Sequence, residues 1–225
     1  MNNYNQVRVS IVNYGLGNLF SIKHAWNSVG IKAEITSSKD TILNSNLVVL
    51  PGVGAFGDAM QSLNELDLSK TIKEVANSET IVVSICLGMQ LLMSKSYEFG
   101  EHKGLDIIEG EVLPLKNING KVKIPQVGWN KLSKYTSCNS NWENSPLKTL
   151  PENTYMYFVH SFYISPTEKN LILSTTNYGG IKFCSSIQLN NIFGFQFHPE
   201  RSGQDGLQIY RNLADLSLNK FINRR

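Results

Sequence analysis

The stretch Thr80-Ile-Val-Val-Ser-Ile-Cys86-Leu-Gly-Met-Gln90-Leu-Leu92 decides the fold. Its first half is a short β-rich apolar run, which is typical of a strand buried on both faces of a parallel sheet. From Leu87 the apolar residues recur at helical spacing. We therefore expect a strand over Ile81–Ile85, a sharp turn at Cys86 and a helix that begins at Leu87.

This strand–nucleophile–helix order is typical of a nucleophile elbow, with cysteine in the place of serine. The N-terminus of a helix favours a thiolate, because its partial positive charge and free N–H groups face the sulfur. The N–H of Leu87 could also stabilise an oxyanion. A small buried residue at the end of a strand remains an equally simple interpretation of Cys86.

Upstream of this stretch, short apolar runs alternate with helical patterns. Strands are predicted over Val7–Val12, Lys32–Thr36 and Leu47–Leu50, and helices over Asn18–Val29 and Ala59–Val75. This order favours a mostly parallel, doubly wound α/β sheet flanked by helices.

The C-terminal half adds further strands, which we expect to be antiparallel. The strand-like segments are Glu109–Leu115, Asn130–Ser133, Tyr155–Ile164, Leu171–Thr176, Ile181–Gln188 and Ile192–Phe197. A closing helix is predicted over Gly206–Leu218. The polar segment Tyr135–Thr154, which contains Cys138 and Trp142, is interpreted as a surface loop.

Composition excludes several classes of protein. The chain has 225 residues, of which 41% are hydrophobic and 17% charged, with a net charge of +3. It is too apolar for a disordered chain, and its length suits a single domain over residues 1–225 with a core of about 7–218. No basic cluster suggests nucleic acid, and no apolar run approaches the length of a membrane span. Because the three cysteines lack paired spacing and no signal peptide is evident, we expect a soluble, cytoplasmic protein without disulfides or zinc.

A cysteine nucleophile needs a base, and the chain has four histidines, His24, His102, His160 and His198. His198 is the best candidate because it follows an apolar run and precedes Pro199-Glu200. In an extended segment His198 and Glu200 point to the same side, so the carboxylate could orient the imidazole. A triad in the order Cys86, His198, Glu200 is therefore predicted.

The run Pro51-Gly-Val-Gly-Ala-Phe56 follows another buried strand. Its glycines permit a tight turn that turns backbone N–H groups toward a ligand. A phosphate cradle is the competing interpretation, and it is disfavoured because the residues that complete a nucleotide-binding fingerprint are missing.

These three blocks resemble the signatures of class I, triad-type glutamine amidotransferases. Further blocks narrow the resemblance: Asn13-Tyr-Gly-Leu-Gly-Asn18, Val127-Gly-Trp-Asn130 and Tyr157-Phe-Val-His-Ser161. Together they resemble the family of glutaminase subunits of imidazole glycerol phosphate synthase. The resemblance implies hydrolysis of glutamine, and delivery of ammonia to a separate (β/α)8-barrel cyclase that forms imidazole glycerol phosphate and AICAR in histidine biosynthesis.

The resemblance also implies a role for each matching residue. Cys86, His198 and Glu200 would be catalytic. Gly52, Val53 and Leu87 would form the oxyanion hole, and Gln90, Ser161 and Phe162 would bind glutamine. Asn13, Tyr14, Trp129 and Asn130 would face the partner subunit. No metal or organic cofactor is implied.

Three positions depart from the family pattern: Ser84 stands in place of a usual Gly, Asn13 of a usual Asp and Gln126 of a usual His. They leave open a related amidotransferase that supplies ammonia for amidino-sugar formation in surface-polysaccharide or flagellin-glycan biosynthesis. A catalytically silent binding subunit and a stand-alone cysteine hydrolase are further alternatives. The intact triad argues against the first, and the Gly-Trp-Asn block argues against the second.

Overall fold

A computed structural model describes residues 4–117, 120, 122–136 and 142–223. The helices are α1 (Leu19–Ser28), α2 (Lys39–Leu43), α3 (Phe56–Glu65), α4 (Leu68–Ala76), α5 (Leu87–Leu91) and α6 (Gly203–Asn223), with short 3-10 turns that include η2 (Trp142–Asn144) and η4 (Pro199–Arg201). The strands are β1 (Val9–Val12), β2 (Ala33–Thr36), β3 (Leu47–Leu50), β4 (Ile81–Ile85), β5 (Met93–Ser96), β6 (His102–Lys103), β7 (Ile108–Pro114), β8 (Gln126–Lys131), β9 (Ser133–Lys134), β10 (Tyr155–His160), β11 (Phe162–Pro166), β12 (Ile172–Tyr178), β13 (Ile181–Leu189) and β14 (Ile192–Phe195).

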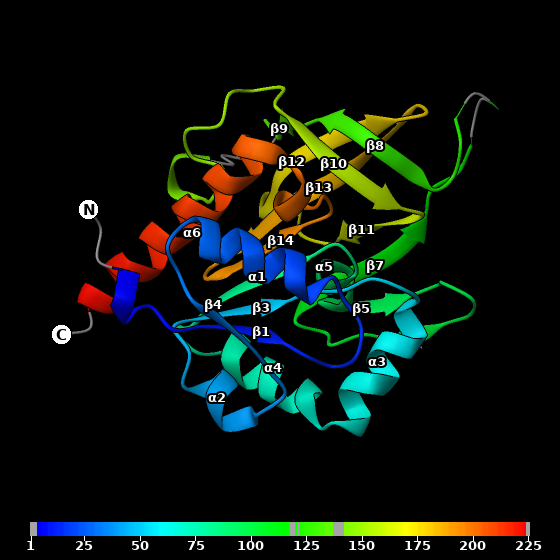
Figure 1. Cartoon of the computed structure of the whole chain (residues 1–225). Helices are drawn as coiled ribbons and strands as arrows, with labels where there is room; N and C mark the ends of the chain where they lie inside the picture. The colour runs from blue at the N-terminus through cyan, green and yellow to red at the C-terminus, as the bar shows by residue number, and fades with distance from the viewer. Residues whose placement is uncertain (1–3, 118–119, 121, 137–141, 224–225) are drawn as a thin grey trace.

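The central sheet has eight strands in the order β2-β1-β3-β4-β14-β13-β12-β9. From β2 to β14 neighbouring strands are parallel, and from β14 to β9 they are antiparallel. The predicted fold class is therefore confirmed, including the antiparallel strands of the C-terminal half. Strand β4 pairs with both β3 and β14, so the segment that ends at Cys86 lies inside the parallel region and away from the edge strands of the sheet (Figure 1).

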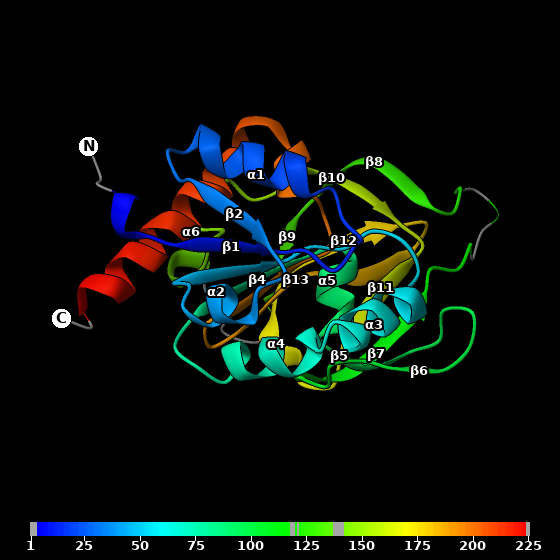
Figure 2. The same ribbon diagram turned by 60° about the horizontal axis from the view of Figure 1, so that its bottom comes forward.

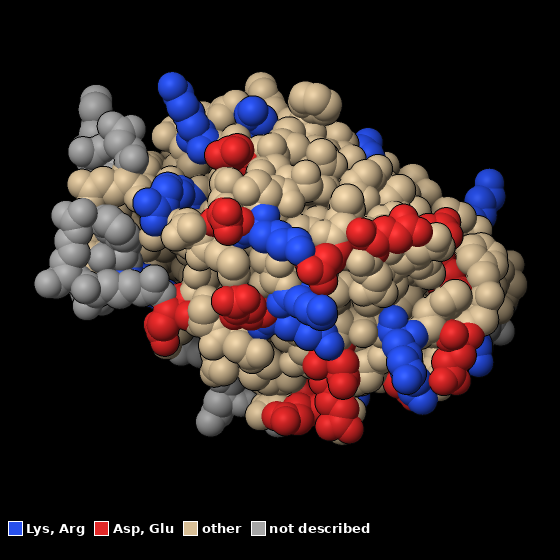
Figure 3. Space-filling model, turned by 90° about the horizontal axis from the view of Figure 1, so that it is seen from below, with Lys and Arg blue, Asp and Glu red and all other residues tan. Residues whose placement is uncertain are grey.

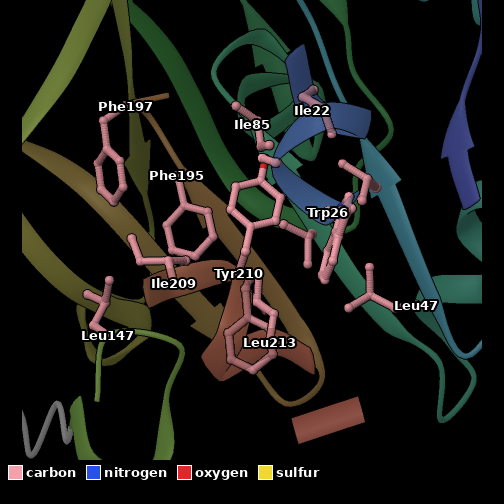
Figure 4. Packing of buried hydrophobic residues seen from close by; sticks show 14 of the residues in the cluster. Ile22, Trp26, Leu47, Ile85, Leu147, Phe195, Phe197, Ile209, Tyr210 and Leu213 are labelled. Carbon is pink, nitrogen blue, oxygen red and sulfur yellow. The ribbon is translucent and has the colours of Figure 1, made fainter. Parts of the chain in front are cut away.

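Helices cover both faces of this sheet (Figures 1 and 2). On one face α1 and α6 pack together, and the rings of Trp26 and Tyr210 meet edge to face with centroids 4.9 Å apart. Figure 4 shows these rings beside Ile22, Ile85 and Phe195. On the other face α3 and α4 bury residues such as Phe56 and Ile72 against the opposite sides of the same strands. Burial on both faces accounts for the continuous apolar runs of the parallel strands.

Two smaller sheets stand beside the central one. Strands β8 and β10 form an antiparallel pair, and β11, β7, β5 and β6 form a second sheet in that order. The segment Tyr155–Ile164, predicted as one strand, is interrupted at Ser161 and contributes to both sheets. This interruption brings residues 159–162 to the carboxyl end of β4, next to Cys86.

Two further sequence predictions about elements are wrong, and one is confirmed. The helix expected over Ala59–Val75 is two helices, because the chain turns between α3 and α4 at Asp67, whose φ is 53°. The helix predicted to begin at Leu87 is present as α5, which ends at Leu91 and is followed by β5. The segment Tyr135–Thr154 is not simply a surface loop, since Trp142, Leu147 and Leu150 belong to the hydrophobic core; Cys138 lies outside the described residues.

Charged residues are mixed in sign on the face that α3 and α4 cover. Figure 3 shows this face from below, with Lys and Arg side chains interspersed among Asp and Glu. Asp67 forms exposed ion pairs with Lys39 and Lys70 at 2.6 and 3.7 Å. Exposed pairs of this kind contribute little to stability, so this face is held mainly by its apolar contacts.

Candidate active site

Cys86 lies at a sharp turn between β4 and α5. Its φ and ψ are 54° and −112°, a strained backbone conformation for any residue except glycine. Its N–H donates to Phe195 O at 2.7 Å, and its carbonyl accepts from the N–H groups of Met89 and Gln90. Gly88 permits the turn to lie close to β3, because a Cβ there would overlap the carbonyl oxygen of Leu50. The turn at Cys86 is therefore strained and is held in place by these hydrogen bonds and by the contact with β3, as expected for a nucleophile elbow.

His198 and Glu200 form a hydrogen-bonded pair directly beyond β14. His198 Nδ1 lies 2.8 Å from Glu200 Oε1, and both side chains are almost fully buried. The N–H of His198 donates to Tyr157 O at 2.9 Å, which ties this segment to β10. No other described polar atom holds His198 Nε2, so this nitrogen is available to Cys86.

The protonation of His198 follows from its neighbours. Burial by itself would lower its pKa, but the negative charges of Cys86 and Glu200 and the hydrogen bonds to them raise it to about 10. These neighbours therefore favour the protonated form of the imidazole. An imidazolium beside a cysteine is the arrangement that supports nucleophilic catalysis by a thiolate.

A cavity of about 280 Å³ opens at Cys86. Its lining residues are Val53, Gly54, Cys86, Leu87, Gln90, Glu98, Pro125, Val159, His160, Ser161, Phe162 and His198. This volume lies at the small end of the range for ligand pockets, roughly 300–1,000 Å³, and suits a molecule of amino-acid size. The cavity brings together most of the predicted catalytic and substrate-binding residues.

The second histidine of the cavity, His160, differs from His198 in charge. Burial lowers its pKa to about 4, against the hydrogen bond from its Nδ1 to Phe162 O at 2.8 Å. Its ring packs against Phe183, with centroids 5.0 Å apart. His160 is therefore a neutral member of the cavity wall, and His198 is the group suited to proton transfer.

Gln90 is fixed on the first turn of α5 by hydrogen bonds from its side-chain amide. Its Nε2 donates to Phe162 O at 3.0 Å and to Gln196 Oε1 at 3.2 Å. Gln196 Nε2 in turn lies 3.7 Å from Cys86 Sγ. Sequence reasoning did not select Gln196, although its position two residues before His198 on the same side of an extended segment could have indicated it.

The loop after β3 lies against the start of α5. A Cβ on Gly52 would lie 2.7 Å from Leu87 Cβ and 2.6 Å from Gly88 N, so only glycine permits this approach. Pro51 O accepts a hydrogen bond from the buried hydroxyl of Tyr14 at 2.6 Å. The loop therefore brings the backbone of residues 52–54 to the same place as the first N–H groups of α5, which have no partner within the helix.

Glu98 is a cavity residue that sequence reasoning missed. Its Oε2 accepts from the N–H of Phe56 at 2.6 Å, at the start of α3. Burial raises its pKa above the usual range, although this hydrogen bond and the charge of His102 act in the other direction. The local pattern gave no signal, because residues 97–101 read as an ordinary polar turn.

The carbonyl oxygens of the two predicted backbone contacts are already occupied. Ser161 O accepts from Leu115 N at 2.8 Å, and Phe162 O accepts from Gln90 and His160. Phe162 O therefore already has two partners, whereas Ser161 O keeps a second lone pair that could accept from a substrate.

The four residues predicted at the partner face have different surroundings. Trp129 is 56% exposed on β8. Asn130 is half-buried and donates to Asn177 O at 2.9 Å. Asn13 is half-buried and accepts from Gly15 N at 3.2 Å. Tyr14 is buried, and its hydroxyl is used by Pro51, so its side chain is not presented to a partner.

Two of the departures from the family pattern are buried polar residues. The hydroxyl of Ser84 in β4 and Oε1 of Gln126 in β8 are buried and have no hydrogen-bond partner among the described residues. Neither side chain removes an atom of the triad. Within the same described residues there is no group of three or more His, Cys, Asp or Glu that could hold a metal ion, and no helix has the length and apolar character of a membrane span.

The model of the family "Glutamine amidotransferase class-I" matches residues 1–215. The chain therefore belongs to the class-I glutamine amidotransferase family.

Curated relatives define the branch of this family. The chain is 42% identical over 207 residues to the imidazole glycerol phosphate synthase subunit HisH of Chlorobaculum tepidum, and 44% identical over 211 residues to that of Wolinella succinogenes. Each match covers 92% of this chain and 99% of the relative. At this identity and coverage the chain is a HisH-type member of the family.

Solved structures agree with the fold. The crystal structure of a glutamine amidotransferase superposes with a TM-score of 0.69 at 15% identity, covering 93% of this chain and 98% of that one. The structure of PurLQS from Thermotoga maritima gives a TM-score of 0.66 at 19% identity, covering 93% and 98%.

Proposed function

We propose that the chain is the glutaminase subunit of an imidazole glycerol phosphate synthase. It hydrolyses glutamine to glutamate and ammonia, and the ammonia passes to a separate cyclase subunit in histidine biosynthesis. The observation that carries this proposal is the buried Cys86, His198 and Glu200 constellation at one small cavity, in a chain whose curated relatives are HisH subunits. Those relatives favour the histidine pathway over amidino-sugar formation.

The reaction runs through a thioester of Cys86. The thiolate attacks the side-chain amide carbon of glutamine, and the proton held by His198 Nε2 passes to the leaving nitrogen, which departs as ammonia. His198 then takes a proton from water as the water attacks the thioester, and glutamate and Cys86 are released. Glu200 orients the imidazole and supports its positive charge in both steps. Two easier steps replace one difficult hydrolysis.

Backbone N–H groups stabilise the oxyanion in this mechanism. Leu87 supplies one at the start of α5, and the Gly52–Val53 segment supplies the second from the neighbouring loop. One such donor changes a rate by roughly 10²–10³. The close packing of Gly52 on Leu87 and Gly88 supports this assignment, because it holds both sources of N–H beside Cys86.

The substrate is oriented by the polar groups of the cavity wall. Glu98 is the carboxylate of that wall, and it suits the α-ammonium group of glutamine. Both hydrogens of Gln90 Nε2 are used by Phe162 and Gln196, so its oxygen is left as an acceptor for substrate N–H groups. Ser161 and Phe162 complete the wall on the opposite strand.

The partner subunit docks on the outer face of the β8–β10 pair. Val127, Trp129 and Tyr155 are 59%, 56% and 50% exposed there, an apolar surface of the kind that protein interfaces use. A (β/α)8-barrel cyclase is the occupant that the family resemblance implies. Asn13 would contribute to the same interface, while Tyr14 and Asn130 donate to the backbone carbonyls of Pro51 and Asn177. Residues 1–225 would work as one glutamine amidotransferase domain in this complex.

A substitution of the nucleophile tests the proposal. With the cyclase present, Cys86→Ala abolishes synthesis from glutamine and preserves synthesis from added ammonium salt, because only ammonia release depends on the thiolate. Product formation is measured with each nitrogen source. Near wild-type glutamine hydrolysis by the variant would exclude Cys86 as the nucleophile.

A further inference from the structure

Gln196 links the nucleophile and the substrate-binding amide in one buried hydrogen-bond chain. Three hydrogen bonds form this series. Gln90 Nε2 donates to Phe162 O at 3.0 Å and to Gln196 Oε1 at 3.2 Å, and Gln196 Nε2 donates to Cys86 Sγ at 3.7 Å. Gln196 is fully buried, and its N–H donates to Ser185 O at 2.9 Å, so its backbone is fixed by the sheet. The position of this side chain is therefore determined at both ends.

The direction of these hydrogen bonds is set by Phe162. A carbonyl oxygen can only accept, so the atom of Gln90 that faces it must be Nε2. Gln90 Nε2 then requires an acceptor at Gln196, which must be Oε1, and this leaves Gln196 Nε2 facing the sulfur. The orientation of both amides thus follows from one backbone oxygen.

An amide N–H that faces sulfur favours one protonation state of Cys86. A thiol can donate its proton to Val159 O, which lies 3.7 Å from Sγ. A thiolate has no proton to donate and instead needs donors, and Gln196 Nε2 is placed to be one. A hydrogen bond to a charged group is stronger than one between neutral groups.

We propose that Gln196 is a positioning residue for the glutaminase reaction, with two effects: its amide nitrogen stabilises the Cys86 thiolate, and its amide oxygen fixes Gln90 for substrate binding. This inference rests on the proposed function. It assigns to one buried side chain a link between the reactivity of the nucleophile and the affinity for glutamine.

The test compares two substitutions of Gln196 in the full chain. Gln196→Met keeps the length of the side chain and removes both hydrogen bonds. Gln196→Glu keeps an acceptor for Gln90, and its ionised form offers Cys86 no donor. The rate of alkylation of Cys86 by iodoacetamide is measured against pH by mass spectrometry of the Cys86 peptide, and KM and kcat for glutamine are measured in the complex with the cyclase.

For Gln196→Met we expect the midpoint of the alkylation profile to move about one pH unit toward alkaline pH, and the KM for glutamine to rise about tenfold. For Gln196→Glu we expect at least the same shift of the profile with a KM near that of the wild type. The matched control is Asn212→Leu, which removes another buried amide that donates to two backbone carbonyls, those of Pro146 and Lys148, away from the cavity. It lowers stability without moving the alkylation profile.

Two results would overturn the inference. An unchanged alkylation profile in both Gln196 variants shows that the side chain has no effect on the thiolate, and an unchanged KM in Gln196→Met shows that it does not fix Gln90. Failure of the proposed function is a separate result: alkylation of wild-type Cys86 would then leave glutamine hydrolysis intact.

Discussion

At the scale of single residues, Cys86 combines backbone strain with contacts that hold the strain in place. Its positive φ costs of order 1–3 kcal/mol for a residue with a side chain. The hydrogen bond from its N–H to Phe195 O and the close contact of Gly88 with β3 oppose relaxation of the turn. The sulfur is therefore presented at the cavity in one orientation, between Val159 O and Gln196 Nε2.

Ser84 allows the loss of folding stability caused by an unpaired buried hydroxyl to be measured directly. Because its oxygen has no partner among the described residues, we expect Ser84→Ala to raise the free energy of unfolding by about 1 kcal/mol and to leave glutamine hydrolysis unchanged. Urea denaturation measures the first quantity. Ser10→Ala is the control, since its hydroxyl is 2.7 Å from that of Ser45 and its loss should lower stability. A destabilised Ser84→Ala would mean that the hydroxyl is paired.

The pKa values of the two histidines of the cavity should be shifted in opposite directions, that of His160 below and that of His198 above the usual value. Burial keeps His160 neutral until the pH falls to about 4, and the charges of Cys86 and Glu200 keep His198 protonated until the pH rises to about 10. Nuclear magnetic resonance of the imidazole groups measures both values. In Cys86→Ala the pKa of His198 should fall, because the thiolate is absent, while that of His160 stays low. An unchanged His198 in this variant would show that the thiolate does not control its proton.

At the scale of elements, periodicity predicted the parallel strands well because burial on both faces leaves a continuous apolar run. Strands β3 and β4 begin and end where the sequence places them. Helices α3 and α4 were predicted as one helix, because Leu66 and Leu68 continue the apolar pattern across the turn at Asp67. The break at Ser161 was missed for a similar reason: both sides are β-rich, and only the pairing partners β8 and β7 differ.

The loop before α1 supports the loop after β3, and this contact predicts an effect of Tyr14→Phe. The change removes the hydrogen bond to Pro51 O and leaves residues 52–54 freer to turn their N–H groups away from the oxyanion. We expect kcat for glutamine hydrolysis to fall about tenfold with KM nearly unchanged, because the lost contact acts in the transition state. Steady-state kinetics in the complex provides the measurement.

Tyr178→Phe is the matched control for this prediction. It removes an equivalent tyrosine–carbonyl hydrogen bond, from Tyr178 to Lys123 O at 2.7 Å, outside the cavity. Equal effects of the two substitutions on kcat would show that Tyr14 has no specific influence on the oxyanion loop.

At the scale of the whole molecule, the site lies where the carboxyl ends of the parallel strands meet. Cys86 follows β4, Gly52 follows β3 and His198 follows β14, so strand order alone brings together residues that are more than a hundred positions apart. The sequence could predict that Cys86 and His198 lie close together because each follows a recognisable strand, and Glu200 lies two residues beyond His198. It gave no signal for Glu98, and for Gln196 it offered only the spacing from His198, because the contacts of both side chains join segments that only the fold brings together.

The β8–β10 pair connects the exposed apolar face to the proposed catalytic residues, which predicts that a partner controls the activity. Tyr157 O accepts from the N–H of His198. The ring centroids of Tyr157 and Trp129 are 6.1 Å apart, and Arg201 Cζ lies 4.4 Å from the centroid of Tyr157. A partner seated on Trp129 would therefore touch an element that is hydrogen-bonded to His198, the proposed catalytic base.

We expect slow hydrolysis of glutamine by the isolated chain and a rise of roughly 10²–10³ when the ligand-loaded cyclase binds, the effect of gaining one oxyanion donor. Trp129→Ala should weaken the complex and reduce this rise, because it removes the largest exposed anchor of the docking face, while the low basal rate stays nearly unchanged. Glutamate production is measured with and without cyclase and its ligand. Phe20→Ala is the control, since Phe20 is 81% exposed on α1, outside the β8–β10 pair. Equal rates in all conditions would identify an autonomous glutaminase. The contact between β10 and His198 would then not transmit the binding of a partner to the active site.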